Sequence, residues 1–140
     1  MIKFQYLNQL KLKTFSFNGI SMKGYKLQTS PCEIPASQNK VIEEHFGLAS
    51  DGNGKISIAQ MTAPSGWTEP YQTPNFDEFT LVISGKKQII IGDKKIVLKA
   101  GQSIKVFKNS RVQYSNPFSK PCKYISICTP AFSPKAANRE

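Results

Sequence analysis

The chain has 140 residues, enough for one hydrophobic core but not for two. Its 39% hydrophobic and 11% aromatic residues indicate a folded globular domain rather than a disordered segment. The net charge of +10 would suit a nucleic-acid or membrane partner, but the lysines are scattered singly or in pairs, such as Lys86 and Lys87 at a turn. Without a basic helix or an arginine-rich arm, the charge predicts neither partner.

The remaining bulk features favour an intracellular domain. No apolar run approaches the roughly 20 residues that span a bilayer, and the N-terminal residues lack the pattern of a signal peptide. We therefore expect a cytoplasmic protein. Three cysteines, Cys32, Cys122 and Cys128, form no CxxC pair and no cluster with histidine. They are interpreted as buried free thiols in a reducing compartment.

Residues 1–40 are predicted to form an N-terminal extension that packs on the main body. Short alternating segments at 14–18 and 22–28 suggest strands, with turns at Asn18-Gly19 and Lys23-Gly24. Residues 30–40 contain two prolines and several small polar residues, which is typical of a surface connection.

Residues 41–140 form the predicted main domain. The segment 41–50 fits either a strand or a short helix, and the glycine-rich residues 51–54 then require a turn. Residues 55–63 alternate cleanly, with Ile56, Ile58 and Gln60 on one face and Ser57, Ala59 and Met61 on the other. The loop at 64–77 contains three prolines, which confine it to extended and turn conformations.

From Glu78 onward short strands follow one another every 8 to 12 residues or so. They are predicted at 78–85, in a hairpin at 87–98 folded about Gly92-Asp93-Lys94, and at 101–107, 111–117 and 122–128. No helical periodicity interrupts them, so the pattern predicts an all-β sandwich or barrel. The tail at 130–140 is expected to lie along the surface.

Two motifs within residues 66–117 resemble those of the cupin superfamily. The first is carried by Gly66, Glu78 and Gly85, and the second by Gly101 and Asn116. The resemblance covers about the last two-thirds of the chain. It implies a double-stranded β-helix, also called a jelly-roll barrel, and a homodimer, which would cover exposed strand edges.

The sequence departs from the family at the positions that bind metal. The His-x-His pair falls on Tyr71 and Thr73, the histidine of the second motif falls on Val112, and only Glu78 remains of the usual ligands. His45, the single histidine, precedes both motifs and is interpreted as an ordinary side chain. A histidine-held transition metal is therefore not predicted, nor is any other cofactor.

The stretches at 64–85 and 124–134 are similar to bacterial cupin-domain proteins of unassigned function and, more loosely, to ethanolamine-utilisation cupins, which also lack the metal histidines. By analogy, the second resemblance raises acyl-phosphate or phosphoryl chemistry. Neither resemblance names a substrate.

Strand alternation predicts a polar pocket at the mouth of the barrel. Its expected lining is Glu69, Tyr71, Thr73, Glu78 and Tyr114, rimmed by Trp67, Gln72 and Arg111. Such a pocket would bind a small polar metabolite. Glu78 as a general base, with Tyr71 or Tyr114 as the proton donor, would suit an isomerisation, an epimerisation or an elimination without a metal.

Three alternatives remain open at this stage. Glu69, Glu78 and Tyr71 could hold an ion in an unorthodox metalloenzyme site. The chain could instead be a non-catalytic regulatory module whose basic face meets an acidic partner. The barrel could also be filled by its own side chains.

Overall fold

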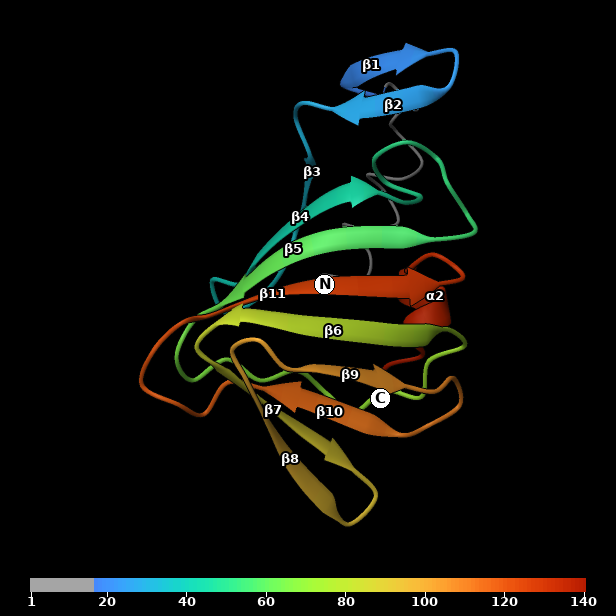
Figure 1. Cartoon of the computed structure of the whole chain (residues 1–140). Coiled ribbons are helices and arrows are strands. Elements are labelled where there is room, and N and C mark those ends of the chain that lie inside the picture. Colours follow the sequence, from blue (N-terminus) through green and yellow to red (C-terminus); the bar gives the residue numbers. More distant parts are fainter. Residues whose placement is uncertain (1–16) are drawn as a thin grey trace.

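The structure is a computed structural model that describes residues 17–140, and part of the predicted strand at 14–18 lies outside that range. Figure 1 shows that the described chain is built almost entirely of strands. They are β1 (Gly19–Met22), β2 (Tyr25–Gln28), β3 (Cys32–Ile34), β4 (Val41–Phe46), β5 (Ser57–Ala63), β6 (Asp77–Ser84), β7 (Lys86–Ile91), β8 (Lys94–Lys99), β9 (Ser103–Val106), β10 (Val112–Ser115) and β11 (Cys122–Thr129).

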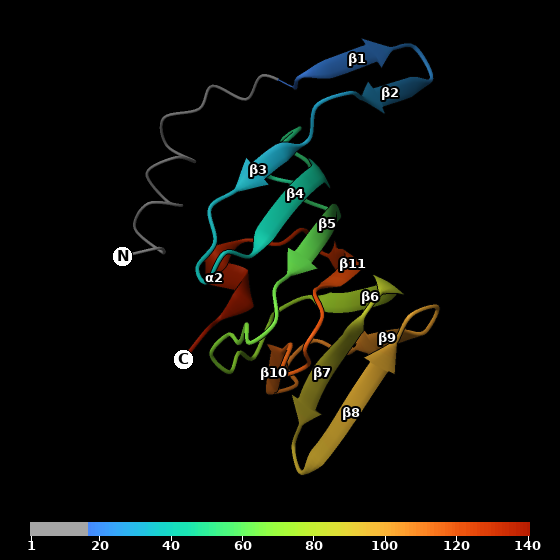
Figure 2. The same cartoon turned by 90° about the vertical axis from the view of Figure 1, so that its left-hand side faces the viewer.

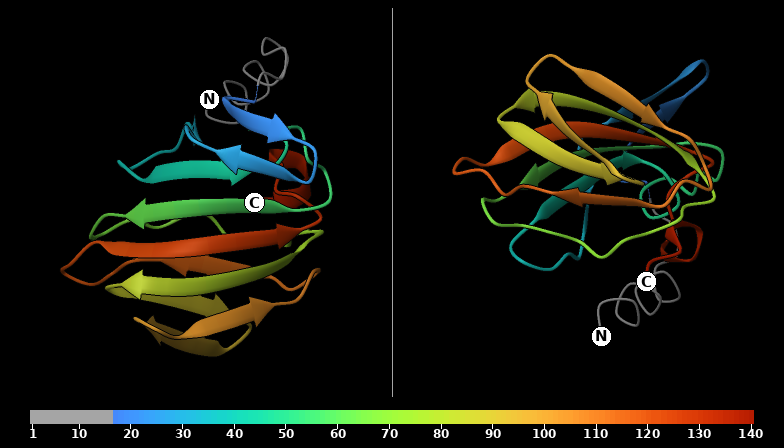
Figure 3. Two further views of the ribbon diagram at one scale, coloured as in Figure 1. Left: turned by 45° about the horizontal axis from the view of Figure 1, so that its top comes forward. Right: turned by 90° about the horizontal axis from the view of Figure 1, so that it is seen from below.

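Two antiparallel sheets face each other and enclose the interior (Figures 1 and 3). The larger sheet has the strand order β3-β4-β5-β11-β6-β9, and the smaller has the order β10-β7-β8. The non-consecutive neighbours β5, β11 and β6 show that the chain crosses between layers, as in a double-stranded β-helix. Among residues 17–140 no helix is long and apolar enough to cross a membrane.

The predicted strands of the main domain are confirmed. Segment 41–50, which fitted either a strand or a helix, forms strand β4 as far as Phe46. The hairpin of β7 and β8 turns at Gly92-Asp93, with Ile91 opposite Lys94. Gly85 separates β6 from β7 with a φ of 76°, and a Cβ there would meet the Pro121 carbonyl oxygen at 2.3 Å. The position is therefore closed to any residue but glycine.

A small hairpin of β1 and β2 projects from the barrel (Figure 2) and turns at Lys23-Gly24, as predicted. Lys26 pairs with Asp51 at 3.3 Å, and the Gln28 side chain donates to the His45 carbonyl oxygen at 2.7 Å. Beyond the hairpin, β3 pairs with β4 and so extends the large sheet.

The expectation that the tail lies along the surface is wrong. Ala131 and Ala137 are buried, and Phe132 packs against Phe76 at 6.0 Å between ring centroids. The tail includes a short helix, α2 (Pro134–Ala137), which begins where the Ser133 hydroxyl accepts from the Ala136 amide. The last residues then pair with the loop at 71–75. The tail is therefore anchored at one end of the barrel because its small and aromatic side chains complete a core there.

Candidate functional site: lysines and aromatic rings inside the barrel

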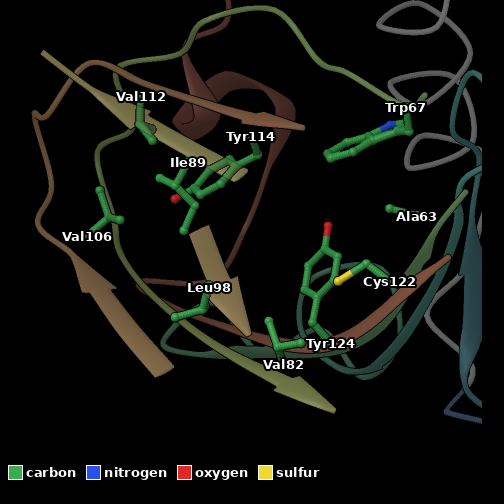
Figure 4. Close-up of a cluster of buried hydrophobic side chains, with 10 residues drawn as sticks. All are labelled: Ala63, Trp67, Val82, Ile89, Leu98, Val106, Val112, Tyr114, Cys122 and Tyr124. Carbon is green, nitrogen blue, oxygen red and sulfur yellow. The ribbon is translucent and has the colours of Figure 1, made fainter. Parts of the chain in front are cut away.

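The interior between the two sheets is lined by buried aromatic side chains. Figure 4 shows Trp67, Tyr114 and Tyr124 pointing toward the same part of the interior from three different chain segments. Each of the three is at most 3% exposed. The cluster also contains Ala63, Val82, Ile89, Leu98, Val106, Val112 and Cys122.

A lysine from the small sheet enters this aromatic cluster. Lys87 shares the inward face of β7 with Ile89, and it is 1% exposed. Its Nζ lies 3.8 Å from the ring centroid of Tyr124 and 4.1 Å from that of Tyr114. Since Tyr114 and Tyr124 belong to β10 and β11, the Lys87 amine lies between the two sheets. Burial lowers the pKa of Lys87 below its usual value.

A second lysine approaches from the loop before β4. The Lys40 side chain is 6% exposed, and its Nζ lies 3.9 Å from the Trp67 ring centroid and 5.5 Å from that of Tyr124. Burial lowers the pKa of Lys40 to about 8, opposed by the charge of Glu69 and assisted by that of Lys87. Two amines therefore share the ring of Tyr124.

The segment before Lys40 is fixed to the loop that carries Trp67. The Gln38 side chain donates to the Thr68 carbonyl oxygen at 2.6 Å and accepts from the Thr68 amide at 3.1 Å. Gln38 and Asn39 both have a φ of 58°, an uncommon left-handed conformation for residues other than glycine. This double hydrogen bond holds Lys40 and Trp67 over the same end of the interior.

Two carboxylates complete the charged groups of the interior. Glu69 Oε2 lies 4.0 Å from Lys40 Nζ and 3.6 Å from Arg139 Nη2. Glu78, on the inward face of β6, accepts a hydrogen bond of 2.5 Å from the Ser126 hydroxyl of β11. The ion pairs of the described residues place neither carboxylate within 4.0 Å of Lys87 Nζ.

Two buried hydroxyl groups have no hydrogen-bond partner among the described residues, namely Tyr114 Oη and Thr80 Oγ1. Burial, followed by the charges of Glu78 and Glu69, raises the pKa of Tyr114 well above its usual value. Since buried polar groups are normally satisfied, each of these hydroxyls is a position where a polar ligand can supply the missing partner, and the ring of Tyr114 lies 4.1 Å from Lys87 Nζ.

The structure brings some of the predicted site residues together. Glu78 and Tyr114 face the interior, as does Trp67, which belongs to the core rather than to the rim. Glu69 reaches the interior through its contact with Lys40. These residues contribute to the lysine and aromatic cluster.

The predicted orientation of Tyr71 and Thr73 is wrong by one residue. Gln72 pairs directly with the inward residue Val112 and is 2% exposed, so its neighbours point the other way. Tyr71 stacks against the guanidinium of Arg111, whose Cζ lies 3.8 Å from the ring centroid. Arg111 itself is exposed and forms a bidentate pair with Glu140 at 3.0 and 2.8 Å. The error arose because strand parity was extended through a proline-containing loop that does not alternate strictly.

Sequence reasoning missed both lysines of the site. Lys87 was assigned to a solvent-exposed turn, although the alternation of β7 places it on the same face as Ile89 and Ile91. That parity was a usable signal. Lys40 had no comparable signal, because it enters the barrel from a connection that lacks periodicity.

The thiol prediction holds for two cysteines. Cys122 and Cys128 are buried and form no disulfide, and Cys32 is half-buried. Burial raises the pKa of Cys122 and of Cys128. Both thiols therefore stay protonated near neutral pH.

The residues present do not fit the metal that the cupin resemblance implies. Within residues 17–140 no three His, Cys, Asp or Glu side chains gather into a possible metal site. The inward positions where histidines would be expected hold Gln72 and Val112, and two amines lie nearby. Tyr71, which could have joined Glu69 and Glu78 around an ion, packs against Arg111 instead.

The fold and its interior site define a jelly-roll barrel of the double-stranded β-helix class. A family model described as "Cupin domain" matches residues 59–128, half of the chain. The protein belongs to the cupin superfamily.

Two solved ethanolamine-utilisation proteins share this fold. The EutQ protein of Clostridium difficile is 27% identical, with a TM-score of 0.55, over 66% of this chain and 65% of that chain. The EutQ protein of Salmonella typhimurium LT2 is 18% identical, with a TM-score of 0.61, over 84% of this chain and 96% of that chain. The resemblance to ethanolamine-utilisation cupins predicted from sequence is confirmed.

A curated relative is similar over a longer stretch. The protein named endoribonuclease YbeY of Myxococcus xanthus is 37% identical over 123 residues, or 88% of this chain. The present chain spans 40% of that relative's length. The match therefore does not assign the named activity to this chain.

Proposed function

We propose that the barrel interior binds a small metabolite that carries a carboxylate, without a histidine-held metal. The observation that carries the proposal is Lys87, a buried amine that lies between two tyrosine rings and has no carboxylate within ion-pair distance among the described residues. A protonated amine without a counter-charge in such a place is destabilising by several kcal/mol. A bound anion would provide that counter-charge.

The neighbouring groups support the same ligand class. Lys40 supplies a second amine that shares the ring of Tyr124. Tyr114 and Thr80 offer hydroxyls without partners, which can donate to ligand oxygens. Trp67 and Tyr124 both belong to the buried core cluster, so we expect the ligand to be small.

Acid–base catalysis by Glu78 is the finer part of the proposal. Glu78 lies on the interior face, is oriented by the Ser126 hydroxyl, and is close enough to Tyr114 to raise the pKa of that phenol. A base and a potential proton donor that face the interior from opposite sheets would suit an isomerisation, an epimerisation or an elimination. Tyr71, turned toward Arg111, has no part in it.

The test is a thermal-shift screen of the full chain with small carboxylates, including lactate and pyruvate, and with inorganic phosphate. We expect the melting temperature to rise with carboxylate concentration in the wild type and in Lys86→Met, because Lys86 is exposed. The rise should vanish in Lys87→Met. A wild type that responds to none of the carboxylates, or a Lys87→Met variant that responds like the wild type, would refute the proposed site.

We also propose that a second copy of the chain covers the outer face of the large sheet. Phe79, Leu81 and Ile83 point outward from β6 and are 39 to 49% exposed. Phe79 and Leu81, together with Ile125 and Ile127, border a shallow apolar groove of about 230 Å³. Apolar side chains gathered in this way mark an interaction surface.

The charges at the two sides of this face favour a second copy as the occupant. Paired residues on neighbouring strands form rows across this face. In one row Glu43 of β4, Gln60 of β5, Ile125 of β11 and Leu81 of β6 lie side by side. In another row Phe79 of β6 lies beside Lys105 of β9. The face thus carries Glu43 at β4 and, at β9, Lys105, which also pairs with Asp77 at 3.7 Å, with mainly apolar residues between. A two-fold axis through its middle would place Lys105 of one copy beside Glu43 of the other.

A further inference from the structure

The Lys87 amine has the surroundings of a nucleophile rather than of a structural cation. A structural buried lysine is normally paired with a carboxylate, as Lys40 is with Glu69 at 4.0 Å. The contacts of Lys87 Nζ are instead with the rings of Tyr114 and Tyr124. Among the described residues, its amine has neither an ion pair nor a hydrogen bond that would occupy its lone pair once deprotonated.

The surroundings also favour the neutral form of the amine. Burial removes water from the ammonium and is the largest influence on Lys87, so its pKa lies below the usual value although the charges of Glu78 and Glu69 act in the opposite direction. Lys40 is the second cationic group here, because its amine and that of Lys87 both lie over the Tyr124 ring. A desolvated lysine beside a second cationic group is a recognised way to obtain a nucleophilic amine near neutral pH.

We propose that Lys87 forms an imine with the carbonyl carbon of a small oxo acid, whose carboxylate is held by Lys40. This inference rests on the proposed carboxylate site and names its substrate class. Lys40 keeps a pKa of about 8 and is therefore mostly protonated at neutral pH, so the two amines can take different roles.

The step balances with groups that the interior already holds. The Lys87 Nζ lone pair attacks the carbonyl carbon, and the carbonyl oxygen takes up a proton, which gives a carbinolamine. Loss of that hydroxyl as water then leaves a C=N bond, so one amine and one carbonyl yield one imine and one water. Glu78 can shuttle the protons, because it faces the interior from β6 on the opposite sheet.

The two unpartnered hydroxyls can donate hydrogen bonds to the carbonyl oxygen of the oxo acid. Tyr114 Oη belongs to a ring that Lys87 Nζ contacts at 4.1 Å, and Thr80 is next to Glu78 on the inward face of β6. Each can donate a hydrogen bond to the carbonyl oxygen as it gains negative charge. The bound carbonyl and the carbinolamine, which both keep this oxygen, would satisfy two donors that the chain alone leaves unpaired.

The experiment is reductive trapping on the full-length protein. The wild type is incubated with pyruvate and sodium borohydride, which reduces an imine to a stable secondary amine, and the adduct is located by peptide mass mapping. We expect at least about a tenfold excess of adduct on Lys87 over any other lysine. Lys86→Arg should keep the adduct and Lys87→Arg should lose it, while Lys87→Arg retains the charge.

Lactate separates the two proposals, because it has the carboxylate without the ketone. If lactate and pyruvate both stabilise the protein but borohydride traps nothing on Lys87, the imine is refuted and the carboxylate site stands. If neither compound stabilises it, the proposed function itself fails. An adduct spread evenly over exposed lysines overturns the imine proposal even where the variants do not fold, since the mapping is done on the wild type.

Discussion

The two faces of strand β6 differ in the opposite sense from a strand of an ordinary globular protein. On β6 the inward residues are Glu78, Thr80 and Val82, whereas the outward residues are Phe79, Leu81 and Ile83. The inward face also meets Lys87 from the small sheet. Buried polar groups and exposed apolar groups are the informative exceptions to the usual rule of burial. This difference is the basis of both proposals, a ligand inside the barrel and a second copy on its outer face.

The largest expected effect compares an inward isoleucine with an outward one. Ile89 is fully buried and Ile83 is 49% exposed. Ile89→Ala should lower the free energy of unfolding by about 2–5 kcal/mol, because it leaves a cavity in the core. Ile83→Ala should lower it by less than about 0.5 kcal/mol in dilute protein. Urea denaturation, monitored by circular dichroism, measures the free energy of unfolding of both variants. Equal decreases in the two variants would contradict the description of Ile89 as inward and Ile83 as outward.

The next largest effect is the pH dependence of stability that arises from the buried amine of Lys40. The folded pKa of Lys40, about 8, lies below the unfolded value of 10.5, so the unfolded chain binds more protons between those values. Stability from this group therefore increases as the pH rises through that window. The charges facing Lys40 are those of Glu69, Lys87, Arg139 and Glu78.

Lys40→Met removes this titration. We expect the variant to be more stable than the wild type by about 2–3 kcal/mol below pH 8, with the difference shrinking as the pH approaches 10. Denaturant titrations at several pH values give the difference directly. A variant that is less stable than the wild type at pH 7, or a difference that does not change with pH, contradicts the assignment of a destabilising buried amine.

A smaller effect is expected on the outer face, where Leu81 lies in the middle of the apolar groove. Leu81→Lys should raise the dissociation constant of the homodimer at least about tenfold, equivalent to about 1.4 kcal/mol. Val97→Lys is the matched control, because Val97 is similarly exposed on the small sheet. Sedimentation equilibrium measures both, and a wild type that stays monomeric at high concentration rules the dimer out.

The smallest effect is expected at the outward acid next to Glu78. Asp77 pairs with Lys105 at 3.7 Å and accepts from the Lys108 amide at 2.8 Å. Asp77→Asn keeps an acceptor for that amide and loses only an exposed ion pair, so the change should be under about 1 kcal/mol and should fade in salt. If the free energy of unfolding fell by more than about 2 kcal/mol, the ion pair of Asp77 and Lys105 would not be a solvent-exposed one.

The fold was predictable because its signal is repetitive. Alternation in β5, β6 and β11 assigns inward and outward residues correctly, including Glu78 inside and Asp77 outside. The hairpin of β7 and β8 followed from its glycine-containing turn. Such local patterns fix strand direction and face without knowledge of the rest of the chain.

The site was less predictable because its key residues come from irregular segments. Lys40 and Trp67 are brought together by the Gln38 and Thr68 hydrogen bonds, which join parts of the chain that are 30 residues apart. The alternation assumed for Tyr71 and Thr73 failed within the loop, where Gln72 pairs with Val112. Lys87 shows the remaining difficulty, since charge argued for solvent while strand parity argued for the interior.

The measurement that most directly tests the carboxylate site is carbon NMR of the protein labelled at the lysine Cε positions, titrated with lactate. Resonances of Lys87 and Lys40, assigned from Lys87→Arg and Lys40→Met spectra, should shift and saturate together, while that of Lys86 should stay in place. Shifts confined to exposed lysines, or no saturable shift at Lys87, would contradict a carboxylate site inside the barrel.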